Sequence, residues 1–368
     1  MPPVFLHPRT TVASSTAVHT RGVATIANSS EPRIVSRSQA LPNRIRPVTV
    51  LYEHRGQPQR TVIEVTRPTQ FEEVVLSLCR ETTEPPTLSV WPGNARDVPR
   101  AATRAIRNAY SRFAPPLRCE YPVFDTRKFE PNNIAHLLLD LVPVGLFVQN
   151  TLGRDAKSAF RKVVGPFRHV VDLFELGALC THRRIDAEII HVRGTRGLAV
   201  YDLLGTFDCP AITFLPNVYS GRSFPPSHRI EKVFLARRGA RALLNHTDVA
   251  EFLSTLGFQT IFLEDYPIQQ QLAIVAQAKH VVAVHGAGMA GLVLNPAIES
   301  VVEILPPHVY HQLFPMCLGD RVKRYALLMP EYDETVQHRG WDTLSRLKNA
   351  PFRIEIGAVD RALCEVQG

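Results

Sequence analysis

Several common residue patterns are missing from this sequence of 368 residues. None of its six cysteines lies in a Cys-x-x-Cys pair or at ligand spacing from a histidine. A structural zinc site is therefore not expected, and the scattered cysteines indicate reduced core thiols. The sequence also lacks an Asp-x-Asp motif, which would hold a metal ion on a diphosphate, and the Gly-x-Ser-x-Gly motif of α/β-hydrolases. We expect no bound metal and no hydrolase of that class.

Long apolar runs are also missing. The most apolar stretch, Ile134–Val148, contains His136, Asp140 and Pro143 and is shorter than the roughly 20 residues that a transmembrane helix needs. The first thirty residues contain no acid and are rich in Ser, Thr and Ala. This composition fits a disordered tail or an organellar transit peptide, and we favour the tail. We expect a cytoplasmic protein that can associate peripherally with a membrane.

Net charge and chain length restrict the class of partner and the number of domains. The formal net charge is +8, which favours an anionic partner but does not distinguish nucleic acid, acidic membrane and phosphate. A chain of this length suits two domains. We expect a disordered or loosely ordered tail over 1–46, an N-terminal α/β lobe over 47–220 and a C-terminal Rossmann-like lobe over 221–368. The last helix is expected to pack back on the first lobe.

Local patterns predict alternating strands and helices. In the first half, we expect strands over 48–52, 61–65, 88–91, 187–192 and 211–214, and helices over 71–79, 98–113 and 132–148, the last bent at its proline. A linker is expected over 215–229. In the second half, we expect strands over 232–236, 260–263, 281–284 and 301–305, with helices over 248–256, 268–278 and 288–294. This order predicts a parallel sheet with helices on both faces.

A glycine-rich turn follows the strand Val281–Val284. His285, Gly286, Ala287 and Gly288 stand at the carboxyl end of this apolar strand, immediately before a helix. Open α/β sheets bind ligands at this edge, and helix N-termini offer free N–H groups to anions. Glycine lets the backbone approach a phosphate closely. The turn therefore predicts a diphosphate cradle, with a tight packing turn as the alternative.

The same glycines allow a second interpretation. Gly286, Gly288 and Gly291 match the Gly-x-Gly-x-x-Gly dinucleotide fingerprint, with Glu303 as the acid further on. An NAD(P)-dependent oxidoreductase is therefore an alternative function. Pro296 stops the following helix early, which weighs against it. A basic nucleic-acid-binding protein is a second alternative that rests on net charge alone.

The order of features in the second half resembles the family 61 glycosyltransferases. The resemblance runs from about Lys232 to Pro306 and rests on Arg237, Arg238, Arg241, Asn245, Gly257, Phe258, Glu264, Asp265, Gln270, the turn 285–288, Val301, Val302 and Glu303. Upstream, Asn132–Pro143 is similar to a helix of that family that carries Asn, His, an acid and Pro. Met289, Ala290 and Gly291 depart from the usual Leu, Thr or Ser, and Asn.

This resemblance implies an α/β fold of the GT-B type, in which two Rossmann-like lobes with parallel sheets and helices on both faces border a cleft. It implies an inverting hexosyl- or pentosyltransferase of polysaccharide biosynthesis. The C-terminal lobe would bind a nucleotide-sugar donor, with UDP as the default nucleotide. The N-terminal lobe would face a glycan or lipid-linked glycan acceptor. No cofactor and no metal would be required.

Cations and N–H groups must then neutralise the leaving diphosphate. Arg238 and Arg241 follow a strand at the same sheet edge as His285, and guanidinium groups match phosphate geometry. We assign them to the donor site with the turn 285–288, and Arg237 is a weaker candidate.

Three kinds of acidic or basic residue complete the predicted site. Glu264 and Glu303 end strands, and Glu303 is placed to accept hydrogen bonds from ribose hydroxyls. His136 and Asp140 lie at i and i+4 on one helix face. We predict that His136 is the general base and that Asp140 orients it, or that Asp140 acts alone. A structural His–Asp pair is the alternative.

Overall fold

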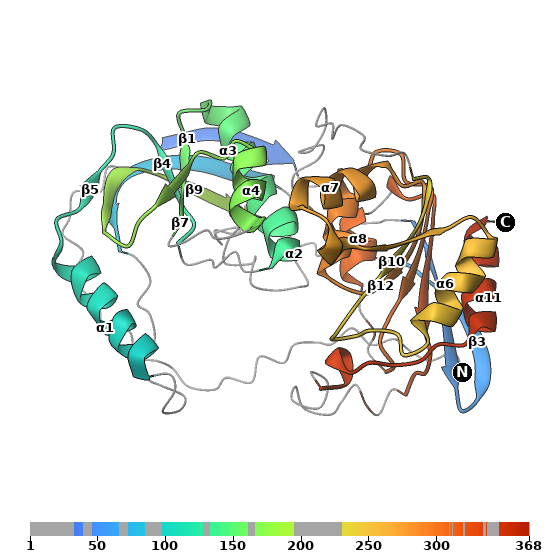
Figure 1. The fold of residues 1–368 in the computed structure, drawn as a ribbon. Coiled ribbons are helices and arrows are strands. Elements are labelled where there is room, and N and C mark those ends of the chain that lie inside the picture. The colour runs from blue at the N-terminus through green and yellow to red at the C-terminus, as the bar shows by residue number, and fades with distance from the viewer. Residues whose placement is uncertain are drawn as a thin grey trace.

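The computed structural model describes residues 33–39, 46–65, 73–84, 98–127, 133–160, 166–194, 230–308, 310, 312–318, 321–333, 336 and 346–367. Within these residues the chain forms two sheets with helices packed around them (Figure 1). The predicted strands 88–91 and 211–214 and the predicted linker 215–229 lie outside the described residues, as does most of the expected tail 1–46.

The second sheet has the strand order β11-β10-β12-β13-β14-β2-β3. Its strands are β2 (Val48–His54), β3 (Gln57–Ile63), β10 (Lys232–Ala236), β11 (Gln259–Phe262), β12 (His280–Val284), β13 (Ser300–Ile304) and β14 (Arg324–Met329). All neighbours are parallel except the hairpin β2–β3. The chain runs from β10 outward to β11 and returns to β12, so the direction of winding reverses between β10 and β12. Open α/β sheets bind ligands at such a reversal.

Helices cover both faces of this sheet, as predicted for the second half. One face carries α7 (Ile268–Gln277), the 3-10 helix η5 (Ala287–Leu294) and α8 (Leu313–Leu318), and the other carries α6 (His246–Thr255) and α11 (Ile356–Gln367). A one-turn helix, η4 (Leu263–Asp265), follows β11. Along β12, Val281 and Ala283 join one apolar cluster and Val282 and Val284 the other. Alternate side chains of a strand point to opposite faces, so both faces need cover.

The N-terminal strands β2 and β3 correct the expected lobe boundary. Sequence order places residues 48–63 in the first lobe, whereas β2 pairs in parallel with β14 in the second sheet. Val50 and Leu51 are buried in opposite clusters, so β2 needs a position covered on both faces. The last helix, α11, packs its Val359 and Leu363 on this same sheet instead of on the first lobe.

The first sheet has the order β1-β4-β9-β6-β7-β8, with β5 paired to β9. Its strands are β1 (Arg33–Gln39), β4 (Glu73–Thr83), β5 (Leu117–Arg118), β6 (Val123–Asp125), β7 (Lys157–Phe160), β8 (Ala178–Cys180) and β9 (Ile185–Gly194). The pairs β1–β4 and β4–β9 are antiparallel and the others parallel, so this sheet is mixed and not parallel throughout.

Two expectations for the first half are wrong. Residues 71–79, predicted as a helix, belong mainly to β4, and part of the expected tail forms β1. A short apolar run does not distinguish a strand from a helix by its period. Pairing decides here, because β4 lies between β1 and β9 along most of its length. The predicted helix 98–113 is confirmed as α1 (Val98–Phe113).

One continuous helix joins the two sheets. It comprises α2 (Ile134–His136), the π-turn η2 (Leu137–Leu141) and α3 (Val142–Leu152). The π-turn ends at Leu141, and Pro143 lies at the start of α3, a position that tolerates its missing N–H. The bend at Pro143 stays a prediction. Both α2 and η2 contact η5, and α4 (Pro166–Leu173) contacts α7 (Figure 1).

This helix is the one described helix that is long and apolar enough to cross a membrane, contrary to the sequence expectation. The window that meets the criterion is 65% buried inside the protein. Leu137, Leu138 and Leu141 share one apolar cluster with Leu292 and Val293 of η5. The helix therefore serves as core between the sheets.

Candidate functional site

The glycine-rich turn lies at the carboxyl end of β12, where the winding reverses. The N–H of His285 donates to the carbonyl of Ile304 (2.8 Å), so the turn begins one residue beyond the strand. Gly286 has an extended backbone (φ 174°), which any residue adopts. A Cβ there would lie 1.9 Å from Nη1 of Arg237, the end of a flexible side chain, so Arg237 would have to move aside. The first glycine of the turn therefore makes room for a cation.

The other two glycines serve packing. A Cβ on Gly288 would lie 2.8 Å from Cδ1 of Leu263, and one on Gly291 would lie 2.5 Å from Cγ2 of Val275. Both distances are below normal contact, so these glycines let η5 approach η4 and α7. A dinucleotide fingerprint calls for a long α-helix after the turn, whereas η5 is a 3-10 helix of 8 residues. This geometry disfavours the dehydrogenase alternative.

Two arginines from the turn after β10 lie beside Gly286. Arg241 donates from Nη1 to the carbonyl of His285 (3.3 Å), while its Nε is buried without a hydrogen-bond partner. Burial and the neighbouring charge of Arg237 lower the pKa of Arg241 to about 10. Burial also lowers the pKa of Arg237. Among the described residues neither arginine forms an ion pair, so positive charge is concentrated at this edge.

A third cation, Lys348, lies in the C-terminal segment, and no motif in the sequence marks it as a site residue. The segment is fixed by backbone hydrogen bonds from Arg241 to Asn349 (3.2 Å) and from Phe352 to Ala242 (3.1 Å). Burial and the charge of Arg241 lower the pKa of Lys348. We call Arg237, Arg241 and Lys348 the cation cluster. Lys348 is far from the two arginines in sequence and meets them only through the tertiary fold.

Arg238 lies in a different environment from the cation cluster. Its guanidinium donates to both carboxylate oxygens of Asp265 (2.6 and 2.9 Å) and lies 3.9 Å from the centre of the Phe262 ring. The hydrogen bond from Arg238 lowers the pKa of Asp265. Glu264 accepts from the backbone N–H of Arg238 (3.3 Å). The structure thus brings two predicted site residues, Arg238 and Glu264, together in an exposed network.

His285 and Glu303 meet inside the protein. Nδ1 of His285 lies 2.5 Å from Oε1 of Glu303, and the hydroxyl of Tyr325 donates to Oε2 (2.5 Å). Phe314 packs edge-on against the imidazole. Glu303 is fully buried with both oxygens occupied, which favours a role in positioning His285 over the predicted contact with ribose.

Burial governs the protonation of this group. It raises the pKa of Glu303 to about 8. It also lowers the pKa of His285 well below the usual value, and Arg241, Lys348 and Arg237 add to the effect. The three members of the cation cluster therefore all act on His285. Burial therefore favours the neutral form of both the imidazole and the carboxyl.

The predicted base lies on the first-lobe side. Asn133 caps its helix by accepting from the N–H of Ala135 (2.8 Å), and His136 in α2 is half-buried. Asp140 lies in the π-turn, and its side chain is outside the described part of the structure. Because α2 contacts η5, the fold brings the element carrying His136 against the helix that follows the glycine turn.

These elements lie within a part of the chain that matches a protein-family model. Residues 124–302 match the family model described as Glycosyltransferase 61. We call residues 124–302 the glycosyltransferase 61 region, because they match this family model. A segment of 82 residues is also 35% identical to the beta-1,2-xylosyltransferase XAX1 of Oryza sativa subsp. japonica. That segment makes up 22% of this chain and 14% of XAX1, so the chain spans only a small part of its relative.

The glycosyltransferase 61 region contains elements of both sheets. It begins in β6, includes the helix of His136 and the arginine turn, and ends in β13. The family resemblance predicted from the motifs is therefore confirmed. Within the described residues, no group of three His, Cys, Asp or Glu side chains gathers as a metal site.

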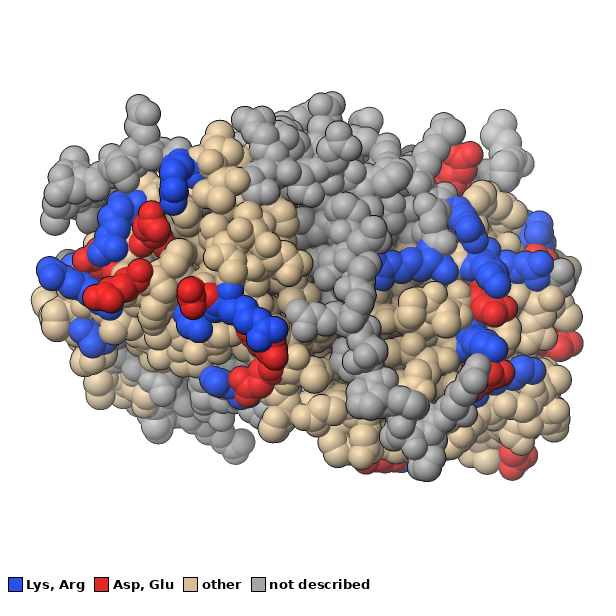
Figure 2. Space-filling model, turned by 90° about the horizontal axis from the view of Figure 1, so that it is seen from above, with Lys and Arg blue, Asp and Glu red and all other residues tan. Residues whose placement is uncertain are grey.

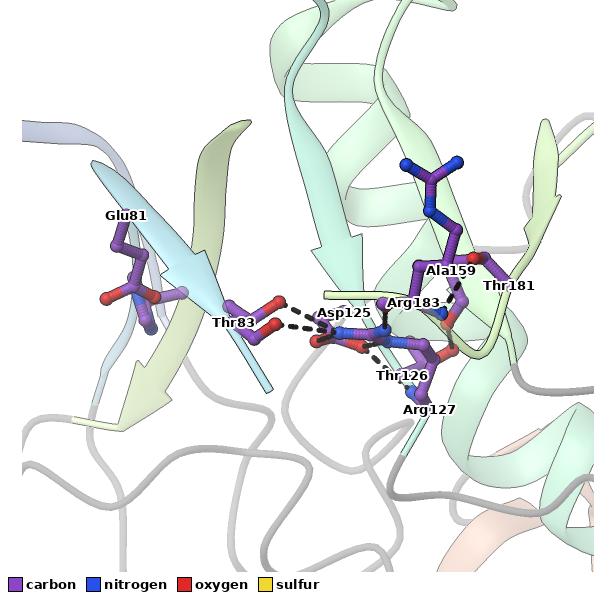
Figure 3. Close-up of polar contacts among 9 residues, drawn as sticks. Glu81, Thr83, Asp125, Thr126, Arg127, Ala159, Thr181 and Arg183 are labelled. Carbon is purple, nitrogen blue, oxygen red and sulfur yellow. Dashed lines mark hydrogen bonds and ion pairs between the residues drawn. The ribbon is translucent and has the colours of Figure 1, made fainter. Parts of the chain in front are cut away.

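Near its start, the glycosyltransferase 61 region holds a fully buried arginine, Arg127, that sequence patterns do not reveal (Figure 3). Its guanidinium donates to both oxygens of Asp125 (2.8 and 2.7 Å) and to the hydroxyl of Thr83 (2.9 Å). Nη1 donates to the carbonyl of Arg183. Arg127 ties the ends of β6 and β4 to the residues before β9. It therefore anchors the first sheet close to where the chain enters the His136 helix.

A separate cavity of about 460 Å³, lined mostly by residues outside the glycosyltransferase 61 region, opens at the carboxyl ends of β2 and β14. Its charged lining residues are Glu53, Arg353, Glu355 and Arg361. Acids and bases balance there, unlike in the cation cluster. The cation cluster is therefore the better anion site.

Proposed function

We propose that this chain is a glycosyltransferase of the GT-B type that moves a sugar from a nucleotide-sugar donor to a hydroxyl group of a glycan acceptor. The donor diphosphate binds at the carboxyl ends of β10 and β12. The single observation that carries this assignment is the cation cluster around Gly286. Membership of residues 124–302 in the glycosyltransferase 61 family supports the class of reaction.

The argument for a diphosphate is electrostatic. Partly buried cations of like sign repel one another and are poorly hydrated, as the lowered pKa values of Arg237, Arg241 and Lys348 indicate. An anion between them relieves both penalties. The position at the reversal of winding, beside a turn whose backbone approaches closely, fits a phosphate chain.

The same cations suit the chemistry of the leaving group. When the bond between the anomeric carbon and the diphosphate oxygen breaks, negative charge grows on that oxygen. Arg237, Arg241 and Lys348 would stabilise this charge without rearrangement. We therefore propose a transfer that does not depend on a metal ion. His285, held by Glu303 and Tyr325, would fix the turn that carries the N–H groups of Ala287 and Gly288.

The acceptor is activated from the first-lobe side. In the proposed inverting reaction, the acceptor hydroxyl attacks the anomeric carbon opposite the leaving diphosphate. Its proton passes to His136, whose imidazole is oriented by Asp140. The new glycosidic bond forms as the bond to the diphosphate breaks. The contact between α2 and η5 supports this proposal, because it brings the element that carries His136 to the helix that follows the glycine turn.

Donor identity is a separate part of the proposal. UDP is the default nucleotide. The relative XAX1 is named a xylosyltransferase, so UDP-xylose is a candidate donor along with UDP-hexoses.

Calorimetry tests the donor site. UDP, UDP-xylose and UDP-glucose should be titrated into the full chain in EDTA, with NAD and NADP as competitors. We expect UDP and at least one UDP-sugar to bind without metal. If no nucleoside diphosphate binds, or if NAD binds in preference to all of them, the proposal fails.

A further inference from the structure

Helix α1 is not used by the proposed reaction, and its surface is unusual. It is 16 residues long, which corresponds to about 24 Å. In Figure 1 it stands apart from the other labelled helices, at the outer end of the first sheet. At its C-terminal end, Arg183 donates from Nη2 to the carbonyl of Pro115 (2.7 Å), which ties the helix to the start of β9. The helix is therefore anchored at its C-terminal end.

Large apolar side chains of α1 face water. Ile106, Tyr110 and Phe113 are 70%, 55% and 79% exposed. They follow one another at i, i+4 and i+7, which places them on one face of the helix. Scattered exposed apolar residues are ordinary, but a continuous stripe of three large ones marks an interaction surface.

All charged residues of α1 are basic. The helix contains Arg100, Arg104, Arg107 and Arg112 and no acidic residue. At 100° per residue, the positions of the first three arginines fall on one side of the helix, about 120° around its axis from the positions of the apolar stripe. Elsewhere the charges are mixed: on the face shown in Figure 2, acidic and basic side chains alternate over both lobes.

We propose that α1 binds the surface of an anionic lipid bilayer. Ile106, Tyr110 and Phe113 would enter the boundary between headgroups and acyl chains, and the arginines would meet lipid phosphates. A basic helix with an apolar face lies in the bilayer interface in this way, and its binding combines buried apolar area with attraction to anionic lipids. A nucleic acid would use only the arginines and leave the apolar stripe in water. The net charge predicts an anionic partner. Helix α1 would bind that partner at a surface separate from the proposed donor site.

Sedimentation of the full chain with vesicles tests this proposal. The vesicles are phosphatidylcholine alone or phosphatidylcholine with phosphatidylserine. We expect binding to the anionic vesicles that weakens as salt is added. The double variant Ile106→Ser, Phe113→Ser should lose at least about tenfold in affinity. The matched control is Val62→Ser, because Val62 is 51% exposed on β3, away from the helix.

Charge is tested separately. Arg100→Gln, Arg104→Gln and Arg107→Gln combined should weaken binding to anionic vesicles by about a hundredfold, at about 1 kcal/mol per arginine. Arg154→Gln is the control, since Arg154 is an exposed arginine paired with Glu175 outside α1. Circular dichroism melts should match wild type for every variant, because the exchanged apolar side chains are exposed.

Three results would overturn the proposal. The first is that neither kind of vesicle binds. The second is binding to polyuridylic acid that is as tight as vesicle binding and unchanged by Ile106→Ser, Phe113→Ser, which would assign the helix to polyanions. The third is a dimer in light scattering that dissociates in the same variant, which would assign the stripe to a second copy of the chain.

Discussion

In the first sheet Arg127 is enclosed by acceptors, whereas in the second sheet Arg241 is partly buried beside two other cations. Asp125 faces Arg127 with both oxygens, and Thr83 and Arg183 supply further acceptors. Arg241 has a carbonyl partner and a buried Nε without one. A buried arginine whose hydrogen bonds are complete stabilises the fold, while a buried arginine without a counter-charge is placed to receive an anion. The predictions below test this distinction.

The largest effect is expected for the chemistry of the first-lobe side. His136→Ala should lower turnover by about 10²–10⁴-fold, as expected for loss of a general base, while UDP affinity stays near wild type. Single-turnover transfer assays and calorimetry measure the two quantities separately. His169→Ala on the exposed face of α4 is the control. A folded His136→Ala protein with full activity would remove His136 from the mechanism.

The next effect concerns the paired arginine. Arg127→Ala should lower the free energy of unfolding by about 3–5 kcal/mol, because it empties a fully buried site and leaves the partly buried carboxylate of Asp125 without its partner. Arg168→Ala is the matched control, since Arg168 pairs with Asp172 on the surface of α4. This variant should lower the free energy of unfolding by no more than about 0.5 kcal/mol. Urea unfolding measures both. Equal effects would show that Arg127 does not anchor the sheet.

The arginine without a counter-charge should behave in the opposite way. Arg241→Ala should weaken UDP binding by about 1.5–3 kcal/mol, the usual worth of charged hydrogen bonds, without destabilising the free protein, since it relieves repulsion with Arg237. Calorimetry and thermal melts without ligand give the two values. Arg238→Ala serves as the comparison and should weaken binding less, because Asp265 already holds that guanidinium. If Arg238→Ala had the larger effect, the phosphate site would lie beside Arg238 and not at the cation cluster.

The smallest effect is a pH dependence of stability. The pKa of Glu303 is about 8 in the folded protein and 4.5 in an ordinary carboxyl, while that of His285 lies well below 6.5. Between about pH 6.5 and 8, the folded pair therefore holds one proton more than the unfolded chain. The free energy of unfolding should fall as pH rises through this range, by at most about 1.4 kcal/mol per pH unit.

Glu303→Gln removes the titrating carboxyl, so this decline should be absent in the variant. Urea unfolding at the two ends of the range measures it. If wild type and variant followed the same pH profile, Glu303 would titrate in the folded protein as it does in the unfolded chain.

Sequence patterns predict the elements around the glycine turn well because those patterns are local. The strand before His285, the glycine turn and the strand before Arg237 are each evident from a few neighbouring residues. Lys348 is missed because it reaches the turn through backbone pairing with the segment after Arg241. Arg238 and Arg241 have equal weight in the sequence, and only burial separates them.

The fold is predicted least well where pairing decides it. The strand β4 contains an apolar run that a helix could also use, and β2 joins a sheet whose other parallel strands lie almost two hundred residues further on. Arg127 gives no signal either, because its acceptors come from three separate parts of the chain. Local periodicity describes single elements and carries no information about which partners meet.

The helix from Ile134 to Leu152 has a mechanical consequence. Its leucines share one continuous core with Leu292 and Val293 of the second sheet, so pulling the sheets apart at this place would expose apolar side chains to water. This contact should therefore resist separation of the two sheets more strongly than a polar contact would. Backbone amides of η2 should then exchange as slowly as those of β12, and rapid exchange in η2 would contradict this.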